Sequence, residues 1–231
     1  RNELGAQRFD AMLSPGRGMR GATPAEQARK GPEVGWQIRA RIGEHEVATR
    51  ALPGARREVE IDDKPATQLA LGGLMRVIWL TPAMDRLWTD PPEVRRRFLD
   101  RVTLSFCPGH AEEALGYDKA MRERNRLLKD EVRDAGWYRA LELQMADLGA
   151  AMTRNRLDAI ARITAAQDVA ETAFPAARLT LLPGEGCADD PDPQSIAARL
   201  AEGRARDMAA GRTLTGPHRA DLGAHWGPQD M

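Results

Sequence analysis

The stretch WLTPAMDRLWTDPPEVRRRFLDR, residues 79–101, decides the fold, because it runs from an apolar strand pattern through a turn into a helix pattern. The helix start is predicted at Asp90-Pro91-Pro92-Glu93: Asp can cap a helix, Pro fits the first turn and Glu93 can bond back to the backbone. The helix is expected to reach about Ser105. The chain therefore changes from sheet to helix within this stretch.

Upstream of this point, the pattern predicts sheet. Residues 34–42 (VGWQIRARI) alternate apolar and polar side chains, which is typical of a half-buried strand. Weaker strand signals follow at 45–52 and 57–61, with a turn at Pro53-Gly54 between them, so we expect an antiparallel meander. Residues 74–80 form a short apolar run that favours a strand buried on both faces.

Downstream, two long apolar stripes predict an antiparallel helical hairpin. The first helix is expected over 111–134, where Asn125 lies within the stripe and is expected to fix the helix register. Gly136 is expected to break it. The second helix is expected to carry a stripe from Trp137 to Ile160 and to end at Phe174-Pro175.

The last part returns to mixed structure. A strand is predicted over 178–182, a loop over 183–193 and a helix over 194–209. The motif GRTLTGPHRADL, residues 211–222, is interpreted as strand, sharp turn and strand. This order predicts an α+β fold in which a helical arm (89–176) is inserted between two sheet-bearing parts (1–88 and 177–231).

Composition is that of an ordinary soluble protein and gives little guidance on partners. Lys+Arg and Asp+Glu are both 34, although residues 1–57 hold eleven basic side chains against six acidic ones. Cys107 and Cys187 form no metal-binding or disulfide pattern. With no secretory signal and no run long enough to span a membrane, a cytoplasmic location and no membrane partner are expected.

Three groups of basic residues are candidates for binding anions. SPGRGMR at 14–20 combines glycines with Arg17 and Arg20 and is either a phosphate-binding loop or an ordinary surface loop. Arg95–Arg97 fan around their helix, so a solvated face and a DNA contact both remain open. In the next helix, Arg122 and Arg124 alternate with acids, which is also usual for a solvated face.

His218, in the GPHR sequence, has three possible roles: catalytic base, phosphate contact or buried structural imidazole. No Ser or Cys nucleophile has an evident arrangement with it, so a structural or phosphate-facing role is preferred. The pattern GxxxxGK[ST] that holds nucleotide phosphates is absent, as is an apolar strand ending in Asp-Glu. The chain alone is therefore not expected to hydrolyse a nucleotide.

Several blocks together resemble the RecF family of DNA replication and repair proteins. They are LSPGRGMR (13–20), WLTPAMDRL (79–87), RRRFLDR (95–101), Tyr117 with RERNRLLK (122–129), and RARD with GRTLTGPHRADL (204–222). No single block is as specific as a nucleotide-binding motif, but the blocks occur in family order across most of the chain.

The resemblance implies an ABC-type ATPase head related to SMC proteins, with an inserted helical arm. It implies ATP and Mg²⁺ as cofactors of the complete protein and an ATP-dependent homodimer on single-stranded or gapped DNA. It also implies RecR, RecO and RecA as partners in repair and the SOS response. By the same analogy, the nucleotide-proximal candidates are Arg17, Arg20, His218 and Arg219. The DNA-binding candidates are Arg20, Arg95, Arg96, Arg97, Arg122 and Arg124.

The chain departs from the family pattern at both ends. Residues 1–11 do not resemble a P-loop helix, and neither the signature motif nor the magnesium-binding strand is present. We therefore expect a central fragment that binds no cofactor by itself. Two hypotheses remain: a RecF-type DNA-repair ATPase seen in part, or a non-catalytic helical module that retains DNA or partner contacts.

Overall fold

The computed structural model describes residues 35–75, 85–173, 175–184, 191–226 and 229–230. The chain divides into two compact units, Arg1–Met84 and Asp85–Met231. The SPGRGMR loop and residues 76–80 of the expected buried strand lie outside the described residues. The three-part division of the chain stays a prediction.

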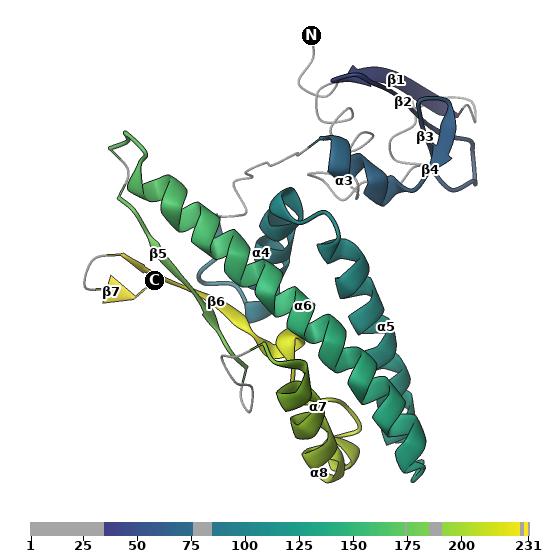
Figure 1. Ribbon diagram of the computed structural model, residues 1–231, viewed down its shortest axis with the longest axis vertical. Helices are drawn as coiled ribbons and strands as arrows, with labels where there is room; N and C mark the ends of the chain where they lie inside the picture. The colour runs from purple at the N-terminus through teal and green to yellow at the C-terminus, as the bar shows by residue number, and fades with distance from the viewer. Residues whose placement is uncertain (1–34, 76–84, 174, 185–190, 227–228, 231) are drawn as a thin grey trace. The chain divides into compact units, whose positions relative to one another are not determined.

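The first unit contains the expected antiparallel meander. Strands β1 (Trp36–Ile42), β2 (His45–Ala51), β3 (Glu58–Ile61) and β4 (Lys64–Ala66) pair in sequence order, as Figure 1 shows. The short 3-10 helix η1 (Gln68–Ala70) and helix α3 (Leu71–Leu74) follow. Leu71 packs on the buried side chains Val47 and Val59, so the apolar face of the sheet is covered. Leu74 is thus helical instead of starting a strand.

The second unit is built on three long helices: α4 (Pro92–Phe106), α5 (His110–Lys129) and α6 (Ala135–Asp168). Helices α5 and α6 lie side by side and antiparallel, which confirms the helical hairpin (Figure 1). Their shared core contains Tyr117, Ala120, Met145 and Met152, together with Leu200 from a later helix.

The helix boundaries differ from the expectation in two places. The α4 N-cap is Pro91, with no side-chain cap, so Asp90 does not cap the helix. The hairpin turn lies before Gly136, because the Asp134 side chain accepts hydrogen bonds from the backbone of Gly136 and Trp137 and starts α6 there. Trp137 is consequently 61% exposed, and Tyr138 takes the buried position.

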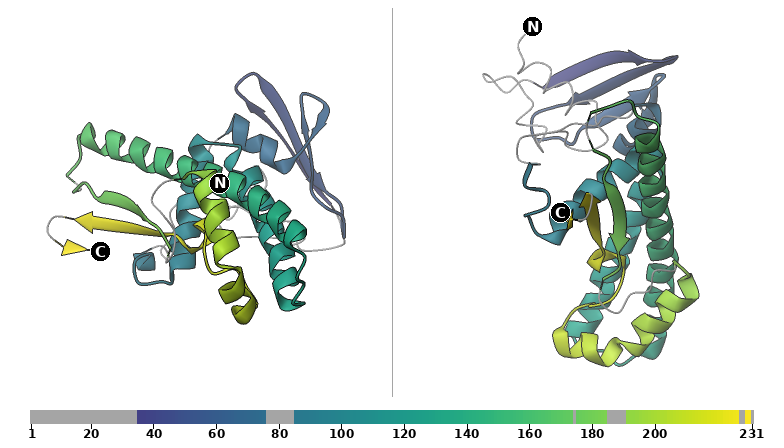
Figure 2. Two further views of the ribbon diagram at one scale, coloured as in Figure 1. Left: turned by 60° about the horizontal axis from the view of Figure 1, so that its bottom comes forward. Right: turned by 90° about the vertical axis from the view of Figure 1, so that its left-hand side faces the viewer.

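A small antiparallel sheet covers the other side of α6. It pairs β5 (Arg178–Leu182) with β6 (Asp221–Trp226), and β6 with β7 (Gln229–Asp230). Its inner face contributes Leu179, Leu181 and Leu222 to a cluster with Leu99 of α4 and Ile160 of α6. Figure 2 shows β5 running along α6 in both views.

Between β5 and β6, the chain forms helices α7 (Pro193–Glu202) and α8 (Arg204–Ala210) and the 3-10 turn η3 (Pro217–Arg219). The predicted helix over 194–209 is thus split at Gly203. The predicted sharp turn is present as η3, and the predicted second strand is β6, but the predicted first strand is wrong: residues 212–216 form an irregular segment. The side chains that hold this segment explain why it is irregular.

Candidate functional site

The segment Gly211–Leu222, called here the anchored segment, runs from the end of α8 into the first two residues of β6. Gly211 ends α8 in the left-handed conformation that glycine adopts without strain. Gly216 has φ 139°, and a Cβ added there would lie 2.4 Å from Oη of Tyr117. The backbone therefore approaches the hairpin too closely for any side chain at position 216.

Arg124 of α5 holds the start of the anchored segment. Its side chain is fully buried, and it donates to Asp207 Oδ2 at 2.7 Å, to Thr213 Oγ1 at 2.8 Å and to Glu142 Oε1 at 3.2 Å. A further bond runs to the Leu200 carbonyl at 2.9 Å. One guanidinium thus joins α5, α6, α7, α8 and the segment, which is the geometry that its planar fork of donors allows.

Neighbouring polar groups complete this network. Oδ1 of Asn125 accepts from the backbone N–H of Thr213 at 2.7 Å and from its hydroxyl at 2.8 Å. Asp207 Oδ1 accepts from Leu214 N at 3.1 Å. Arg204 forms a bidentate ion pair with Glu142. Asn125 therefore fixes the anchored segment and not the register of the hairpin, which corrects the expectation.

Arg156 of α6 holds the middle of the segment through a second buried cluster. It donates to the Pro217 carbonyl at 2.8 Å and to both oxygens of Asp100, at 2.7 and 3.0 Å. His110 contacts the same carboxylate at 2.9 Å. Burial opposes ionisation of Asp100, but the hydrogen bonds from His110 and Arg156 outweigh it and hold the pKa of Asp100 below its usual value.

His218 is a largely enclosed, neutral imidazole. Burial lowers its pKa to about 4, with a smaller contribution from the charges of Arg219 and Arg96. Its Nε2 lies 3.3 Å from the Thr213 carbonyl, which can only accept, so this nitrogen carries the proton. Its Nδ1 then accepts from the Tyr117 hydroxyl at 2.9 Å. This arrangement favours the structural role among the three considered.

The end of the segment is held by α4. Arg95 forms a bidentate ion pair with Asp221, with both N–O distances 2.8 Å, and Arg96 donates to the Ala220 carbonyl at 2.7 Å. Burial opposes ionisation of Asp221, but the bonds from Arg95 and from the Leu222 backbone N–H hold its pKa below the usual value. Arg97, on the same helix, is exposed.

The structure separates the arginine candidates into two groups. Arg95, Arg96 and Arg124 bind the anchored segment. Because Arg124 is fully buried, it does not contact DNA in this conformation, which corrects its prediction as a DNA-binding residue. Arg97, Arg122 and Arg219 are exposed, and Arg122 pairs with Asp118 on its own helix. Arg17 and Arg20 lie outside the described residues.

Sequence reasoning missed the acids and the second arginine of these clusters: Glu142, Asp207, Asp100 and Arg156. The sequence did contain part of the signal for a buried arginine. The helical spacing places Arg124 on the same helix face as Tyr117, Ala120 and Leu128. An arginine on such a face requires buried acids elsewhere in the chain, but the sequence does not say which acids they are.

Neither a metal site nor a membrane span is evident in the part of the chain that the structure describes. Within it, no group of three or more His, Cys, Asp or Glu side chains is placed to hold a metal ion. No helix there is sufficiently long and apolar to cross a bilayer.

Comparison with known proteins identifies the family, although no protein-family model matches the chain. The chain is 43% identical to the DNA replication and repair protein RecF of Mesorhizobium japonicum over 236 residues, which is 96% of the chain and 62% of the relative. It is 42% identical to RecF of Rhizobium meliloti, over 92% of the chain. The chain belongs to the RecF family.

The RecF fold is supported independently by solved structures. The recombination mediator RecF-ATPrS of the RecFOR pathway superposes with a TM-score of 0.81 at 18% identity, over 97% of this chain and 64% of that one. The corresponding RecF-ATP structure gives the same TM-score at 17% identity. The predicted α+β fold of a RecF-type ATPase head with a helical arm is thus confirmed. The chain spans about three fifths of the length of these RecF proteins.

Proposed function

We propose that this chain is the arm-bearing part of a RecF-type recombination mediator acting in DNA repair and replication. In the complete protein, it works with bound ATP and Mg²⁺, as an ATP-dependent homodimer on single-stranded or gapped DNA in the cytoplasm. RecO, RecR and RecA are the expected partners, and RecA loading and the SOS response the expected outcome. Identity above 40% to RecF relatives over most of the chain carries this proposal.

The anchored segment supplies the structural part of the proposal. Pro217 and Ala220, on either side of His218 and Arg219, are buried and held by arginines, whereas Arg219 itself is exposed. A cation on so constrained a backbone can bind an anion without further loss of backbone conformational freedom. Arg219 is therefore proposed to contact a phosphate of nucleotide or DNA in the complete protein, with Arg17 and Arg20 as further candidates.

Exposed arginines of the helices are the proposed DNA contacts within the described residues. Arg97 and Arg122 can approach phosphates, whereas Arg95 and Arg96 are occupied in holding the segment. Removal of one arginine–phosphate interaction should lower the salt dependence of binding by roughly 0.7 to 0.9 in the log–log slope.

The experiment measures binding of fluorescent gapped DNA to the chain at low and at near-physiological salt. Arg97→Ala and Arg122→Ala are expected to weaken binding and flatten the salt slope. Arg178→Ala, which removes an exposed arginine from β5, is the matched control and should leave both unchanged. Equal effects of all three substitutions, or no effect of any, would contradict the assignment. If the complete protein binds DNA but ATP does not change that binding, the result would instead support the second hypothesis, a non-catalytic module that retains DNA contacts.

A further inference from the structure

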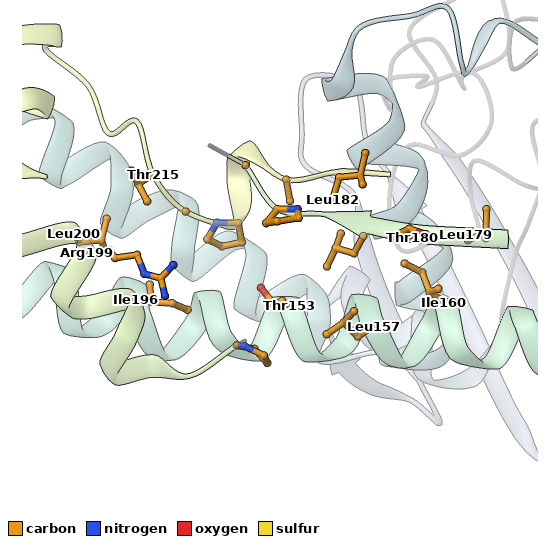
Figure 3. Close-up of a pocket in the computed structure, with 17 residues that line it drawn as sticks. Thr153, Leu157, Ile160, Leu179, Thr180, Leu182, Ile196, Arg199, Leu200 and Thr215 are labelled. Carbon is orange, nitrogen blue, oxygen red and sulfur yellow. The ribbon is translucent and has the colours of Figure 1, made fainter. Parts of the chain in front are cut away.

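A groove of about 490 Å³ lies in the second unit between α6, β5, α7 and the anchored segment, and the proposed phosphate and DNA contacts Arg97, Arg122 and Arg219 do not line it. Figure 3 shows Thr153 and Leu157 of α6 pointing toward β5, with Ile196 and Arg199 of α7 at one end. A volume of this size, with a mostly apolar lining and few polar groups, is usual for a binding site.

The groove exposes apolar surface that the fold leaves uncovered. Leu157 is 39% exposed and Leu182 is 42% exposed, and both line it. Large apolar side chains grouped around one groove contribute more to binding than the same residues scattered over a surface. An occupant must therefore bring apolar side chains of its own.

The strand β5 presents its free edge to this groove. Four consecutive residues, Leu179 to Leu182, line it, although successive side chains of a strand point to opposite faces. The groove therefore reaches the strand edge as well as one face. Among the described residues, β5 pairs with β6 on its other side only, so backbone donors and acceptors along this edge are available to an added strand.

Arg199 sets the charge of the occupant. It is the only charged side chain among the described residues that line the groove. Its one hydrogen bond to a described residue goes to the Ser195 hydroxyl on the same helix, and no described acid forms an ion pair with it. In contrast to Arg124 and Arg156, it does not hold the fold together, so its charge is available to a ligand carboxylate.

From these observations we propose that the groove binds an extended peptide segment of a partner protein, with alternating apolar side chains and a carboxylate that pairs with Arg199. The peptide adds to the edge of β5, its apolar side chains pack on Leu157 and Leu182, and the carboxylate selects its position. The groove shares Thr215, Gly216, Pro217 and Ala220 with the anchored segment, but Arg219, the proposed phosphate contact, does not line it.

Two fluorescein-labelled, terminally blocked peptides test the proposal by anisotropy with the full chain. One peptide is Glu-Leu-Thr-Leu-Thr-Leu-Glu, and in the other both Glu residues are replaced by Lys. Each peptide carries the same charge at both ends, so the result does not depend on whether the peptide binds parallel or antiparallel to β5. The acidic peptide is expected to bind saturably, with a Kd about tenfold lower than that of the basic peptide, the effect of one charge-assisted hydrogen bond. Arg199→Glu should reverse this preference.

Leu157→Lys should abolish binding, whereas Leu115→Lys, which replaces a 58% exposed leucine of α5 outside the groove, should not. Circular dichroism of all variants checks that they fold. Equal binding of both peptides, or saturable binding of neither, overturns the proposal. A dimer in sedimentation that dissociates only in Leu157→Lys would also overturn it, by assigning the groove to a second copy of the chain.

Discussion

Arg122 and Arg124 lie two positions apart on α5 and have opposite surroundings. Arg122 is exposed and pairs with Asp118 one turn away, whereas Arg124 is fully buried among Glu142, Asp207 and Thr213. Residue type and local charge pattern are the same for both, so only their position on the helix decides the role. An arginine of α5 is therefore a buried structural residue or a solvent-exposed residue according to the helix face on which it lies.

The first prediction concerns this pair. Arg124→Ala leaves two buried carboxylates without their shared cation, so it should lower the free energy of unfolding by about 3–5 kcal/mol. Arg122→Ala, the matched control, should change it by less than about 1 kcal/mol because exposed ion pairs contribute little. Urea unfolding followed by circular dichroism measures both, and similar losses for the two variants would show that the Arg124 network is not structural.

The second prediction concerns His218 and pH. Its folded pKa of about 4 lies below the unfolded value near 6.5, so the unfolded chain binds more protons between these limits. Stability should therefore fall as pH falls from about 6.5 to 4, by a total on the order of 3 kcal/mol. His218→Gln should remove that part of the pH dependence. The free energy of unfolding of the wild-type protein and of His218→Gln, measured between pH 4 and 6.5, tests this prediction. Parallel curves of stability against pH for the two proteins would disprove an enclosed neutral His218.

At the scale of elements, the anchored segment owes its shape to distant side chains. Arg95 and Arg96 of α4, Arg124 of α5 and Arg156 of α6 each bind one part of it. The alternating pattern of RTLT favoured a strand, but these hydrogen bonds satisfy its polar groups without one. Helices α4, α5 and α6 could be predicted from local periodicity, whereas the conformation of 212–220 depends on residues as many as 124 positions away.

The third prediction tests this attachment. Asn125→Ala removes the acceptor for the N–H and hydroxyl of Thr213, which is buried, so the free energy of unfolding should fall by about 1–3 kcal/mol. Hydrogen exchange of residues 212–216 should rise more than that of the α5–α6 core. Gln144→Ala, on the exposed face of α6, is the control. Unchanged exchange in the segment would mean that Asn125 does not hold it.

At the scale of the whole chain, the order of sheet, helical arm and sheet was predictable, because strand and helix periodicities are local. The family was recognisable because its blocks keep their order. The pairing of particular acids with particular arginines could not be predicted. The pairs Asp100–Arg156 and Arg124–Asp207 join residues that are 56 and 83 positions apart in the sequence. Pairings of this kind follow only from the packed fold.

The fourth prediction concerns nucleotide binding. The 231 residues contain no GxxxxGK[ST] loop, so calorimetric titration of ATP into this chain should show no stoichiometric binding. The same titration into the complete native protein should show a saturable site. One ATP bound per 231-residue chain would mean that its residues form a nucleotide site of another kind.

The most direct test of the central claim is the affinity of the complete native protein for gapped DNA, measured with and without ATP and Mg²⁺. A RecF-type mediator should bind gapped DNA more tightly with ATP, and Arg219→Ala should reduce that difference while leaving ATP-free binding nearly unchanged. Equal affinities with and without ATP in the wild-type protein would contradict the assignment of this chain to an ATP-dependent recombination mediator.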